Sequence, residues 1–474
     1  MAHMTLDSAI AVNRFGLGAA PGERAGVGAD PRAWLAKQAG QPAPAYPEFG
    51  KLAHSSEALK EYPRWIASLR TAGARTVEET FRAHFGPIML EEFGARLAAA
   101  AATPAPFHER LVWFWANHFT VSAEKPLVFA LVGSFEREAI RPHVTGRFAD
   151  MLLASATHPA MIMYLDNHLS VRKGWQPRQV GRSGAFPPPT GLNENLAREI
   201  LELHTLGVDG GYDQHDVTEF AKVLTGWSIG GDLGQGAGPG PRIARALGQS
   251  DGGDPGEFHF RPFMHEPDDK TVLGKKYAER GVDEGEAVLE MLALHASTAR
   301  HLATKLARHF VADEPPANLV DELANSYLES GGELVPVYQT LIRAEASWRE
   351  PLAKFKTPQD FVISTFRAVG APPDSMQRIT GSLEQLGQRP FTPGSPAGWP
   401  DTAAHWDSGD ALLKRIEWAD TVGRTVGERL EPVALGEAVL GATLGEHSTM
   451  SIARAESRSQ ALALMLASPE FQRR

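Results

Sequence analysis

The sequence of 474 residues contains no cysteine. This absence excludes disulfide bonds, thiolate zinc sites, iron–sulfur clusters and a cysteine nucleophile. No apolar run approaches the roughly 18 residues of a membrane-spanning helix, so we expect no membrane span. The formal net charge of −10 argues against a nucleic-acid partner, because proteins that bind nucleic acids usually carry a basic face.

Several common catalytic motifs are also missing. The sequence has no G-x-S-x-G elbow, no Walker A loop and no Rossmann fingerprint. Its histidines show neither the H-E-x-x-H spacing of a zinc protease nor the E-x-x-H spacing of a di-iron site. Motifs alone therefore identify no reaction.

Composition and hydrophobic periodicity predict a mainly α-helical protein. The chain is 43% hydrophobic and 22% charged, which is ordinary for a soluble globular protein. Apolar residues recur with helical spacing in most segments, for example over 77–102, 317–329, 358–369 and 452–466. We expect one short β-ribbon, in which 257–263 pairs with 271–277. Long Gly/Pro-rich loops connect these elements, and residues 230–256 are so rich in glycine that they predict a surface insertion or flap.

The N-terminus gives little information on localisation. The first four residues, Met-Ala-His-Met, are typical of a cloning remnant before a native start at Met4. From Thr5 onward the sequence has neither the basic region nor the apolar region of an export signal. A signal removed in cloning would leave no trace, so we expect a soluble protein of either the cytoplasm or the periplasm.

Ionisable side chains are densest in the stretch 191–227. Its first part predicts a helix over 192–206 with a leucine stripe. Asn195, Glu199 and Glu202 lie at i, i+4 and i+7 and form a second, polar stripe on that helix. Two neighbouring carboxylates in different environments can hold different pKa values, as general acid/base catalysis requires. A solvated face is the alternative interpretation, with about equal weight.

The other residues of the stretch 191–227 are expected to have structural rather than catalytic roles. Glu194 and Arg198 are four residues apart and are expected to pair. The turn 209–216 has acidic residues that do not follow the calcium-loop pattern. Asp213 is expected to cap the helix that follows.

Other candidate residues are scattered along the chain. His118 ends an aromatic segment, Asp166 follows a short helix, and His265 precedes Lys270 by five residues. A lone histidine on a helix is more often a core or capping residue than a ligand. Trp115 and Trp227 lie beside these polar motifs, where aromatic platforms would suit sugar rings, although buried tryptophans commonly belong to the core.

Several of these motifs occur together, in the same order, in a known family. They are NRFGLG (13–18), FWANHF (114–119), HPAM (158–161), YLDN (164–167), NENLARE (193–199) with Glu202, LTGW (224–227), His265 with Lys270, TKLARHF (304–310) and SPEF (468–471). On these motifs the chain resembles the bacterial DUF1800 family, a group named for having no assigned function. The resemblance spans nearly the whole chain.

The resemblance implies a single, mostly helical domain over 5–474 that contains the insertion 230–256. Many relatives carry export signals, whereas none is visible here. His168 and His204 fall where relatives vary, so the resemblance favours other candidates. These are His118, Asp166, Glu194, Asn195, Arg198, Glu199, Glu202 and His265.

The leading hypothesis is a hydrolase-like enzyme with an acidic, histidine-lined cleft that acts on a polar small molecule or a polysaccharide. Glu199 and Glu202 would be the acid/base pair, and His118, His265 and Asp166 would assist them. The substrate-binding residues would be Arg198, Asn195, Glu194, Trp115, Trp227 and Lys270.

Two alternatives stay open. The first is a metalloenzyme in which a divalent metal is held by ligands among His118, Glu199, Glu202 and His265. The second is a non-catalytic structural or assembly protein, in which the same groups are internal salt bridges. The sequence predicts neither the substrate, the reaction nor the oligomeric state.

Overall fold

The computed structural model describes most of the chain, namely residues 5–69, 76–175, 191–230, 253–254, 256–349, 352–370 and 376–474. These residues form mainly helices, together with two small antiparallel sheets of two strands each. The prediction of a mainly α-helical protein is therefore confirmed. Most of the predicted glycine-rich insertion, 230–256, lies outside the described residues.

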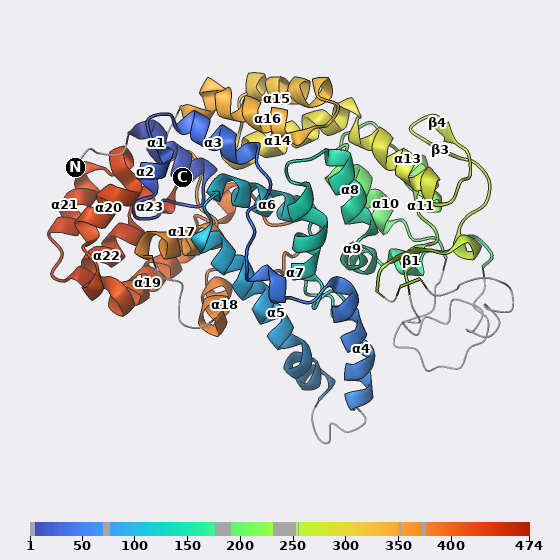
Figure 1. Ribbon diagram of the computed structural model, residues 1–474, viewed down its shortest axis with the longest axis horizontal. Helices are drawn as coiled ribbons and strands as arrows, with labels where there is room; N and C mark the ends of the chain where they lie inside the picture. Colours follow the sequence, from blue (N-terminus) through green and yellow to red (C-terminus); the bar gives the residue numbers. More distant parts are fainter. Residues whose placement is uncertain are drawn as a thin grey trace.

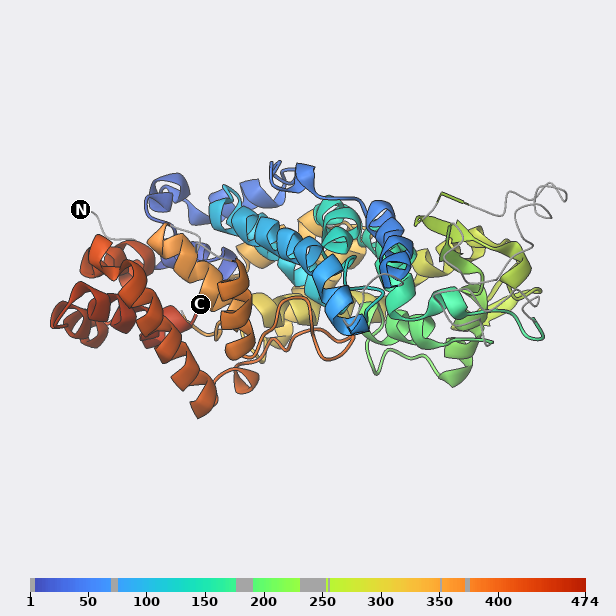
Figure 2. The same cartoon turned by 90° about the horizontal axis from the view of Figure 1, so that it is seen from below.

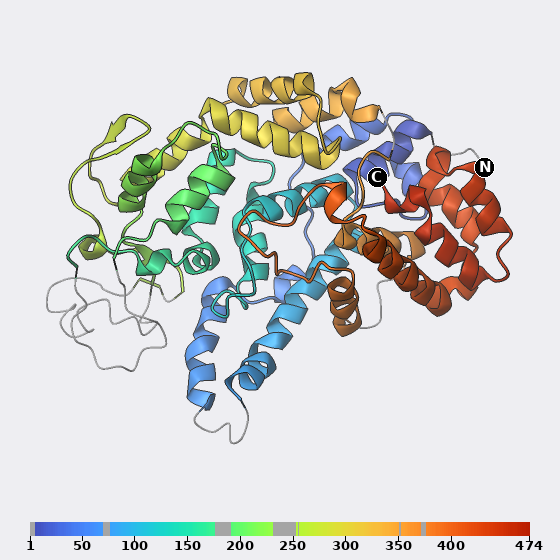
Figure 3. The ribbon, with the colours of Figure 1, turned by 180° about the vertical axis from the view of Figure 1, so that it is seen from behind.

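The helices form an elongated, curved body (Figure 1). The helices of its N-terminal half are α1 (Leu6–Ile10), α2 (Glu23–Val27), α3 (Pro31–Ala39), α4 (Ser55–Leu69), α5 (Val77–Ala102), α6 (Pro106–His118), α7 (Val132–Phe135), α8 (Phe148–Thr157), α9 (Pro159–Tyr164), α10 (Asn195–Glu199) and α11 (Gln214–Val223). Helices α4 and α5 run side by side and project from the body in Figures 1 and 3. Helix α6 lies in its middle.

The C-terminal half continues along the convex edge and returns to the N-terminus. Its helices are α13 (Val282–Ala293), α14 (Ala296–Phe310), α15 (Ala317–Glu329), α16 (Leu334–Arg343), α17 (Pro358–Val369), α18 (Met376–Gln385), α19 (Gly409–Val426), α20 (Pro432–Leu440), α21 (Glu446–Ala453), α22 (Arg458–Ala467) and α23 (Pro469–Gln472). Helices α19 to α22 form one end of the body, beside both termini (Figure 2). The segment between α18 and α19 crosses the rear face towards the middle (Figure 3).

The two sheets differ from the predicted ribbon. Strand β1 (Trp227–Ile229) pairs with β2 (Phe258–Phe260), and β3 (Lys270–Val272) pairs with β4 (Lys275–Tyr277). The prediction that 257–263 pairs with 271–277 is therefore wrong. The reason is the turn at Leu273 and Gly274, which have φ angles of 50° and 71° and fold the second run back on itself.

Local capping sets several helix boundaries. Asp213 caps α11 in a capping box, as predicted. The predicted helix over 452–466 is wrong as a single element, because α21 ends at Ala453 and Ser457 caps the start of α22. The predicted helix over 192–206 is shorter, since α10 covers 195–199 and a wider π-helical turn continues to His204.

The centre of the core is aromatic and joins distant parts of the chain. The ring of Phe15 lies 5.7 Å from that of Phe107 in α6 and 5.7 Å from that of Phe310 in α14. All three side chains are fully buried. Burial of such rings outweighs the entropy lost in ordering long connections, so this cluster fixes α6 against α14.

Buried ion pairs hold α6 to the following segment. Arg141 donates two hydrogen bonds to the Glu109 carboxylate, at 2.6 and 2.8 Å, and a third to Glu136 at 3.0 Å. Glu109 has no exposed surface. Burial raises the pKa of Glu109, but Arg141 outweighs burial, and the net pKa lies below its usual value.

We expect Arg141→Met to lower the free energy of unfolding by about 3–5 kcal/mol, because it leaves the fully buried Glu109 carboxylate without its guanidinium partner. Urea denaturation would measure this loss. Arg82→Met is the matched control, since Arg82 pairs with Glu78 on the exposed surface of a helix and should contribute less than about 0.5 kcal/mol. A loss below about 1 kcal/mol for Arg141→Met would contradict the expectation.

In the part of the chain that the structure describes, none of the helices combines the length and the apolar character that crossing a bilayer requires.

Candidate functional site

The two predicted carboxylates, Glu199 and Glu202, lie where α10 widens into its π-helical turn. Glu199 is half-buried, and burial, followed by the nearby charge of Glu202, raises the pKa of its carboxyl group. The hydroxyl group of Tyr212 donates a long hydrogen bond of 3.5 Å to Glu202. Two neighbouring carboxyl groups, one of them with a raised pKa, have the pattern of an acid/base pair.

The neighbouring charges connect two helices. Arg198 forms an ion pair with Glu194 at 3.1 Å, as predicted. Glu194 also accepts hydrogen bonds from Gln214 at 2.9 Å and from Thr218 at 2.8 Å. These contacts join α10 to α11, while Asn195 is exposed at the start of α10.

His118 lies in the core. Its Nε2 donates to the carbonyl oxygen of His204 at 3.0 Å, and only 1% of its surface is exposed. Burial holds the pKa of His118 well below its usual value. Trp115 is also fully buried and donates from Nε1 to the Tyr338 hydroxyl oxygen at 2.6 Å. Both side chains therefore fill the protein interior.

His265 and Lys270 belong to a second buried cluster. The Nδ1 atom of His265 donates to the carbonyl oxygen of Thr225 at 2.8 Å, and its Nε2 lies 3.2 Å from the Lys270 ammonium group. That ammonium group pairs with Glu284 at 3.1 Å. Trp227, fully buried, packs closely against Gly285, where a Cβ atom would lie 2.3 Å from the indole. Together these contacts lock α13 against the β-strands.

Asp166 lies in a third environment. Its φ angle of 57° marks the end of α9, and its carboxylate pairs with Lys125 at 2.5 Å. Its backbone oxygen accepts a hydrogen bond from Asn193 at 3.1 Å. His118, His265 and Asp166 thus have separate sets of contacts. Among the described residues, no group of three or more His, Asp or Glu side chains is arranged to hold a metal ion.

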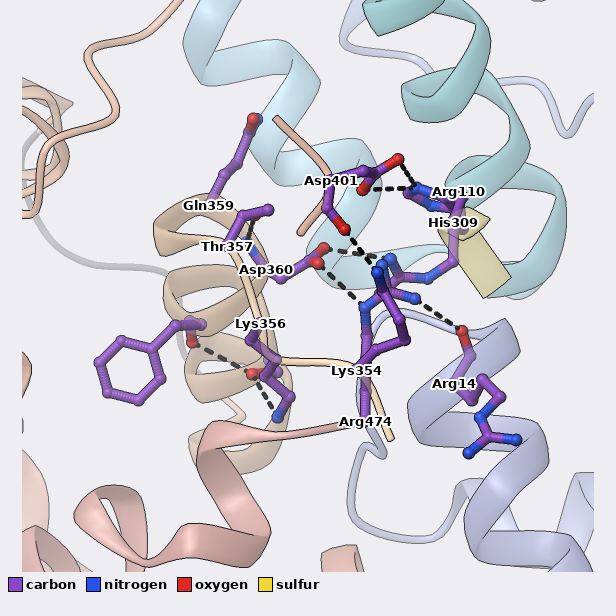
Figure 4. A network of polar contacts seen from close by, with 12 residues as sticks. Arg14, Arg110, His309, Lys354, Lys356, Thr357, Gln359, Asp360, Asp401 and Arg474 are labelled. Carbon is purple, nitrogen blue, oxygen red and sulfur yellow. Dashed lines mark hydrogen bonds and ion pairs between the residues drawn. The ribbon is translucent and has the colours of Figure 1, made fainter. Parts of the chain in front are cut away.

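The structure contains a cavity of about 100 Å³ at a different place, between α6, α14, α17 and the segment that precedes α19. Charged, amide and aromatic side chains from these elements line it, among them Arg96, Arg110, Trp113, Asn117, Glu136, His309, Gln359, Asp360, Trp399 and Asp401. Figure 4 shows the polar network beside this cavity.

Among the residues at the cavity, His309 and Asp401 have the arrangement best suited to catalysis (Figure 4). The Nδ1 atom of His309 lies 2.8 and 3.0 Å from the two carboxylate oxygens of Asp401. Because an ionised carboxylate only accepts hydrogen bonds, Nδ1 carries the proton and Nε2 offers a lone pair. This Nε2 is buried and has no hydrogen-bond partner among the described residues.

The electrostatics keep Asp401 ionised and His309 neutral. Burial lowers the pKa of His309 more than Asp401 raises it, so the net pKa lies below the usual value. Burial alone would raise the pKa of Asp401, but His309, Arg474 and Lys354 hold it far below its usual value. A neutral imidazole oriented by a carboxylate is the arrangement of a general base.

A second carboxylate, Asp360, holds the wall of the cavity (Figure 4). It pairs with Arg110 at 3.2 Å and with Arg474 at 3.2 Å. Its backbone N–H donates a hydrogen bond to the hydroxyl oxygen of Thr357, which caps α17. The Arg110 guanidinium group also donates to the carbonyl oxygen of Gly16. These contacts tie four distant segments of the chain together.

Two further polar atoms at the cavity have no hydrogen-bond partner in the part of the chain that the structure describes. They are Nε1 of Trp113 and Nε2 of Gln359, both buried and both hydrogen-bond donors. The guanidinium group of Arg96 covers the Trp113 ring at 4.4 Å and pairs with Glu136 at 2.6 Å. Buried donors without a partner are costly, so they indicate a position for water or a ligand oxygen.

Sequence reasoning missed this cavity, although two of the recognised motifs border it. His309 belongs to TKLARHF, and Asn117 belongs to FWANHF. The Asn117 side chain donates to the carbonyl oxygen of Trp399 at 2.9 Å and accepts from its N–H at 2.7 Å. This clamp positions the segment that carries Asp401. The separation of 92 residues between His309 and Asp401 hid their pairing.

Comparisons with curated proteins and with solved structures give no match. A family model described as "Protein of unknown function (DUF1800)" matches residues 10–473. This match covers nearly the whole chain, including both motifs at the cavity, and the chain therefore belongs to the DUF1800 family.

Proposed function

We propose that this protein is a hydrolase-like enzyme in which His309 acts as the general base on a polar substrate. One observation carries the proposal, namely the buried Nε2 atom of His309, which has no partner among the described residues while Nδ1 is held by Asp401. His309 would take a proton from water as the water oxygen attacks the substrate. It would then return that proton to the leaving group, while Asp401 stabilises the transient imidazolium ion.

The other polar atoms of the cavity favour a substrate rich in oxygen. Trp113 and Gln359 offer N–H donors that no described residue accepts from, and such donors suit a hydroxyl or carbonyl oxygen. Trp399 adds an aromatic wall of the kind that packs against sugar rings. The volume of about 100 Å³ holds the reacting group and a few water molecules. A carbohydrate, with the rest of the molecule outside the cavity, would meet these requirements.

The pair Glu199 and Glu202 is a second candidate for the same class of reaction. Its support is the raised pKa of Glu199 beside the charge of Glu202. In this version Glu199 would donate the proton to the leaving group and Glu202 would act as the base or nucleophile. A metal-dependent enzyme and a non-catalytic assembly protein are the remaining hypotheses.

A panel of chromogenic glycosides and esters would test the proposal. We expect His309→Gln to lower the rate by about 10²- to 10⁴-fold, because it removes the base. His405→Gln is the control, since His405 is an exposed histidine in the segment that carries Asp401. Thermal unfolding of each variant would show that the fold is intact.

The same panel separates the alternatives. Loss of activity in Glu199→Gln and Glu202→Gln, with His309→Gln unaffected, would favour the carboxylate pair. Activity that disappears with a chelator and returns with a divalent metal would favour the metalloenzyme. If the wild type hydrolyses nothing while His309→Gln is strongly destabilised, the polar network is structural and the proposal fails.

A further inference from the structure

The cavity beside His309 carries more hydrogen-bond donors than the surrounding residues accept from. Nε1 of Trp113 and Nε2 of Gln359 are buried, and no described residue accepts from either. Gln388, which is 5% exposed, lines the same cavity. Its Oε1 accepts from the backbone N–H of Gln359 at 2.8 Å, and no described residue accepts from its N–H₂ group. Because buried donors without an acceptor are costly, the cavity suits a group that only accepts hydrogen bonds.

Arg96 adds further donors in a fixed orientation. Its guanidinium group lies over the Trp113 ring at 4.4 Å and over the Phe391 ring at 5.7 Å. Its Nε donates to Glu136 at 2.6 Å, whereas no described residue accepts from its two N–H₂ groups. Arg96 lines the cavity although it is only 9% exposed. A guanidinium group held in this way offers paired N–H donors, and their spacing matches the two oxygens of a carboxylate.

The cavity wall has few negative charges on the side of Asp360. The Asp360 carboxylate is shared by Arg110 and Arg474, each at 3.2 Å (Figure 4). Arg415 lies behind them and is 2% exposed. Among the described residues it donates only to uncharged oxygen atoms, at 2.8 and 3.0 Å. Three buried guanidinium groups on this side therefore have one buried carboxylate.

Asp401 adds a second carboxylate to the wall, and Lys354 accompanies it (Figure 4). The ammonium group of Lys354 donates to the backbone oxygen of Asp401 and pairs with Asp313, whose side chain is 30% exposed. Together with Asp360 these are three carboxylates, against four cations that are each exposed by no more than 2%. The described side chains of this wall thus keep a net positive charge, which attracts an anion.

We propose that this cavity binds a carboxylate group of the substrate and that Arg96 is the binding residue. The guanidinium group of Arg96 holds the two carboxylate oxygens, and Trp113 and Gln359 donate to their remaining lone pairs. The inference deepens the proposed function and rests on it for the reaction, since it specifies the polar substrate of His309 as an acid. The volume of about 100 Å³ admits the carboxylate and a few atoms beside it, so the remainder of a larger acid, such as an acidic sugar, stays outside.

Calorimetric titration of the full-length protein tests this binding without turnover. The first pair of probes is methyl glucuronide and methyl glucoside, which differ in a carboxylate against a hydroxymethyl group. The second pair is acetate and acetamide, which reduces the comparison to the carboxylate itself. At constant ionic strength, we expect the wild type to bind acetate at least about tenfold more tightly than acetamide, and the glucuronide at least about tenfold more tightly than the glucoside. A preference for acetate alone would assign the carboxylate to an acid other than a sugar.

A lysine variant separates the planar donors of Arg96 from its charge. Arg96→Lys keeps a cation beside Glu136 but removes the pair of parallel N–H donors. We expect it to weaken the binding of the acids by about 10- to 100-fold. Arg137→Lys is the matched control, because Arg137 donates to both carboxylate oxygens of Glu92 and its side chain is 11% exposed, like that of Arg96. Arg137 does not line the cavity, so this variant should bind the acids as tightly as the wild type.

Three results would overturn the inference. They are a wild type that binds acetate no better than acetamide, an Arg96→Lys variant that keeps the wild-type affinity for the acids, and binding of inorganic phosphate without binding of acetate. The comparison of probes on the wild type decides the matter even if a variant fails to fold.

Failure of the proposed function gives a different result. A protein that binds the acids but hydrolyses none of the chromogenic substrates keeps the carboxylate site and loses His309 as a general base. A protein that hydrolyses neutral glycosides and shows no preference for acids keeps the general base and loses the carboxylate site.

Discussion

Asp401→Asn is expected to lower kcat/KM by about 10²- to 10⁴-fold, measured with a substrate that the wild type hydrolyses. The asparagine amide can present its N–H₂ group to the imidazole, which allows the tautomer with the proton on the wrong nitrogen of His309. It also removes the charge that stabilises the imidazolium ion. The substitution keeps the shape of the side chain, so the cavity walls should remain in place.

The pH profile distinguishes this effect from misfolding. Activity requires neutral His309 and therefore rises with pH through the pKa of that group. Burial lowers this pKa and Asp401 raises it. Removal of Asp401 should therefore move the acidic limb of the pH–rate profile to lower pH, while the maximal rate falls. Asp407→Asn is the matched control, because Asp407 is exposed six residues further along the same segment. If the Asp401→Asn enzyme kept the wild-type rate and the wild-type acidic limb of the pH–rate profile, the proposed role of His309 and Asp401 would be refuted.

The protein is expected to lose stability steeply between pH 6.5 and pH 4, because of four buried histidines. His108, His118, His168 and His204 are each exposed by no more than 2%. Burial lowers the pKa of all of them, to about 4 for His108 and His168 and to about 3 for His204. In the unfolded chain each would titrate near 6.5.

The direction of this change in stability with pH follows from proton binding. Below pH 6.5 the unfolded chain takes up protons that the folded protein refuses, so acid favours unfolding until the folded pKa values are reached. Each group contributes up to about 1.4 kcal/mol per pH unit, which gives roughly 5 kcal/mol per pH unit for the four together. Domains are typically stable by only about 5–15 kcal/mol. We therefore expect urea midpoints to fall sharply between pH 6.5 and pH 5.

A glutamine variant provides the control for this titration. His108→Gln keeps a polar side chain that does not titrate, so the slope of unfolding free energy against pH should fall by about a quarter. His447→Gln, at an exposed histidine, should leave the slope unchanged. A stability that stays flat from pH 6.5 to pH 5 would show that the buried histidines are hydrated or already protonated in the folded protein.

The helical framework could be predicted because its signals are local. Helices over 77–102, 317–329 and 358–369 have the bounds expected from apolar spacing and capping residues. Local signals failed where one pattern of residues is compatible with two structures. The run 452–466 keeps helical spacing across a break, and 271–277 could have paired with either neighbour.

The candidate site was predictable only in part. The pair Arg198 and Glu194 and the coupling of Glu199 to Glu202 follow from positions on one helix, and the structure contains both. The proposed roles of His118 and His265 required knowledge of what surrounds them. Both proved to be enclosed by the core and by internal polar contacts.

By itself the sequence determined the absence of thiol chemistry, the mainly helical fold, the capped boundaries and the family. Only the tertiary structure decided which ionisable groups meet. His309 reaches Asp401 because Phe15 fixes α14 against α6 and because Asn117 clamps Trp399. The physical reason is that periodicity and capping act over a few residues, whereas burial, counter-charges and unpartnered donors depend on segments hundreds of residues apart.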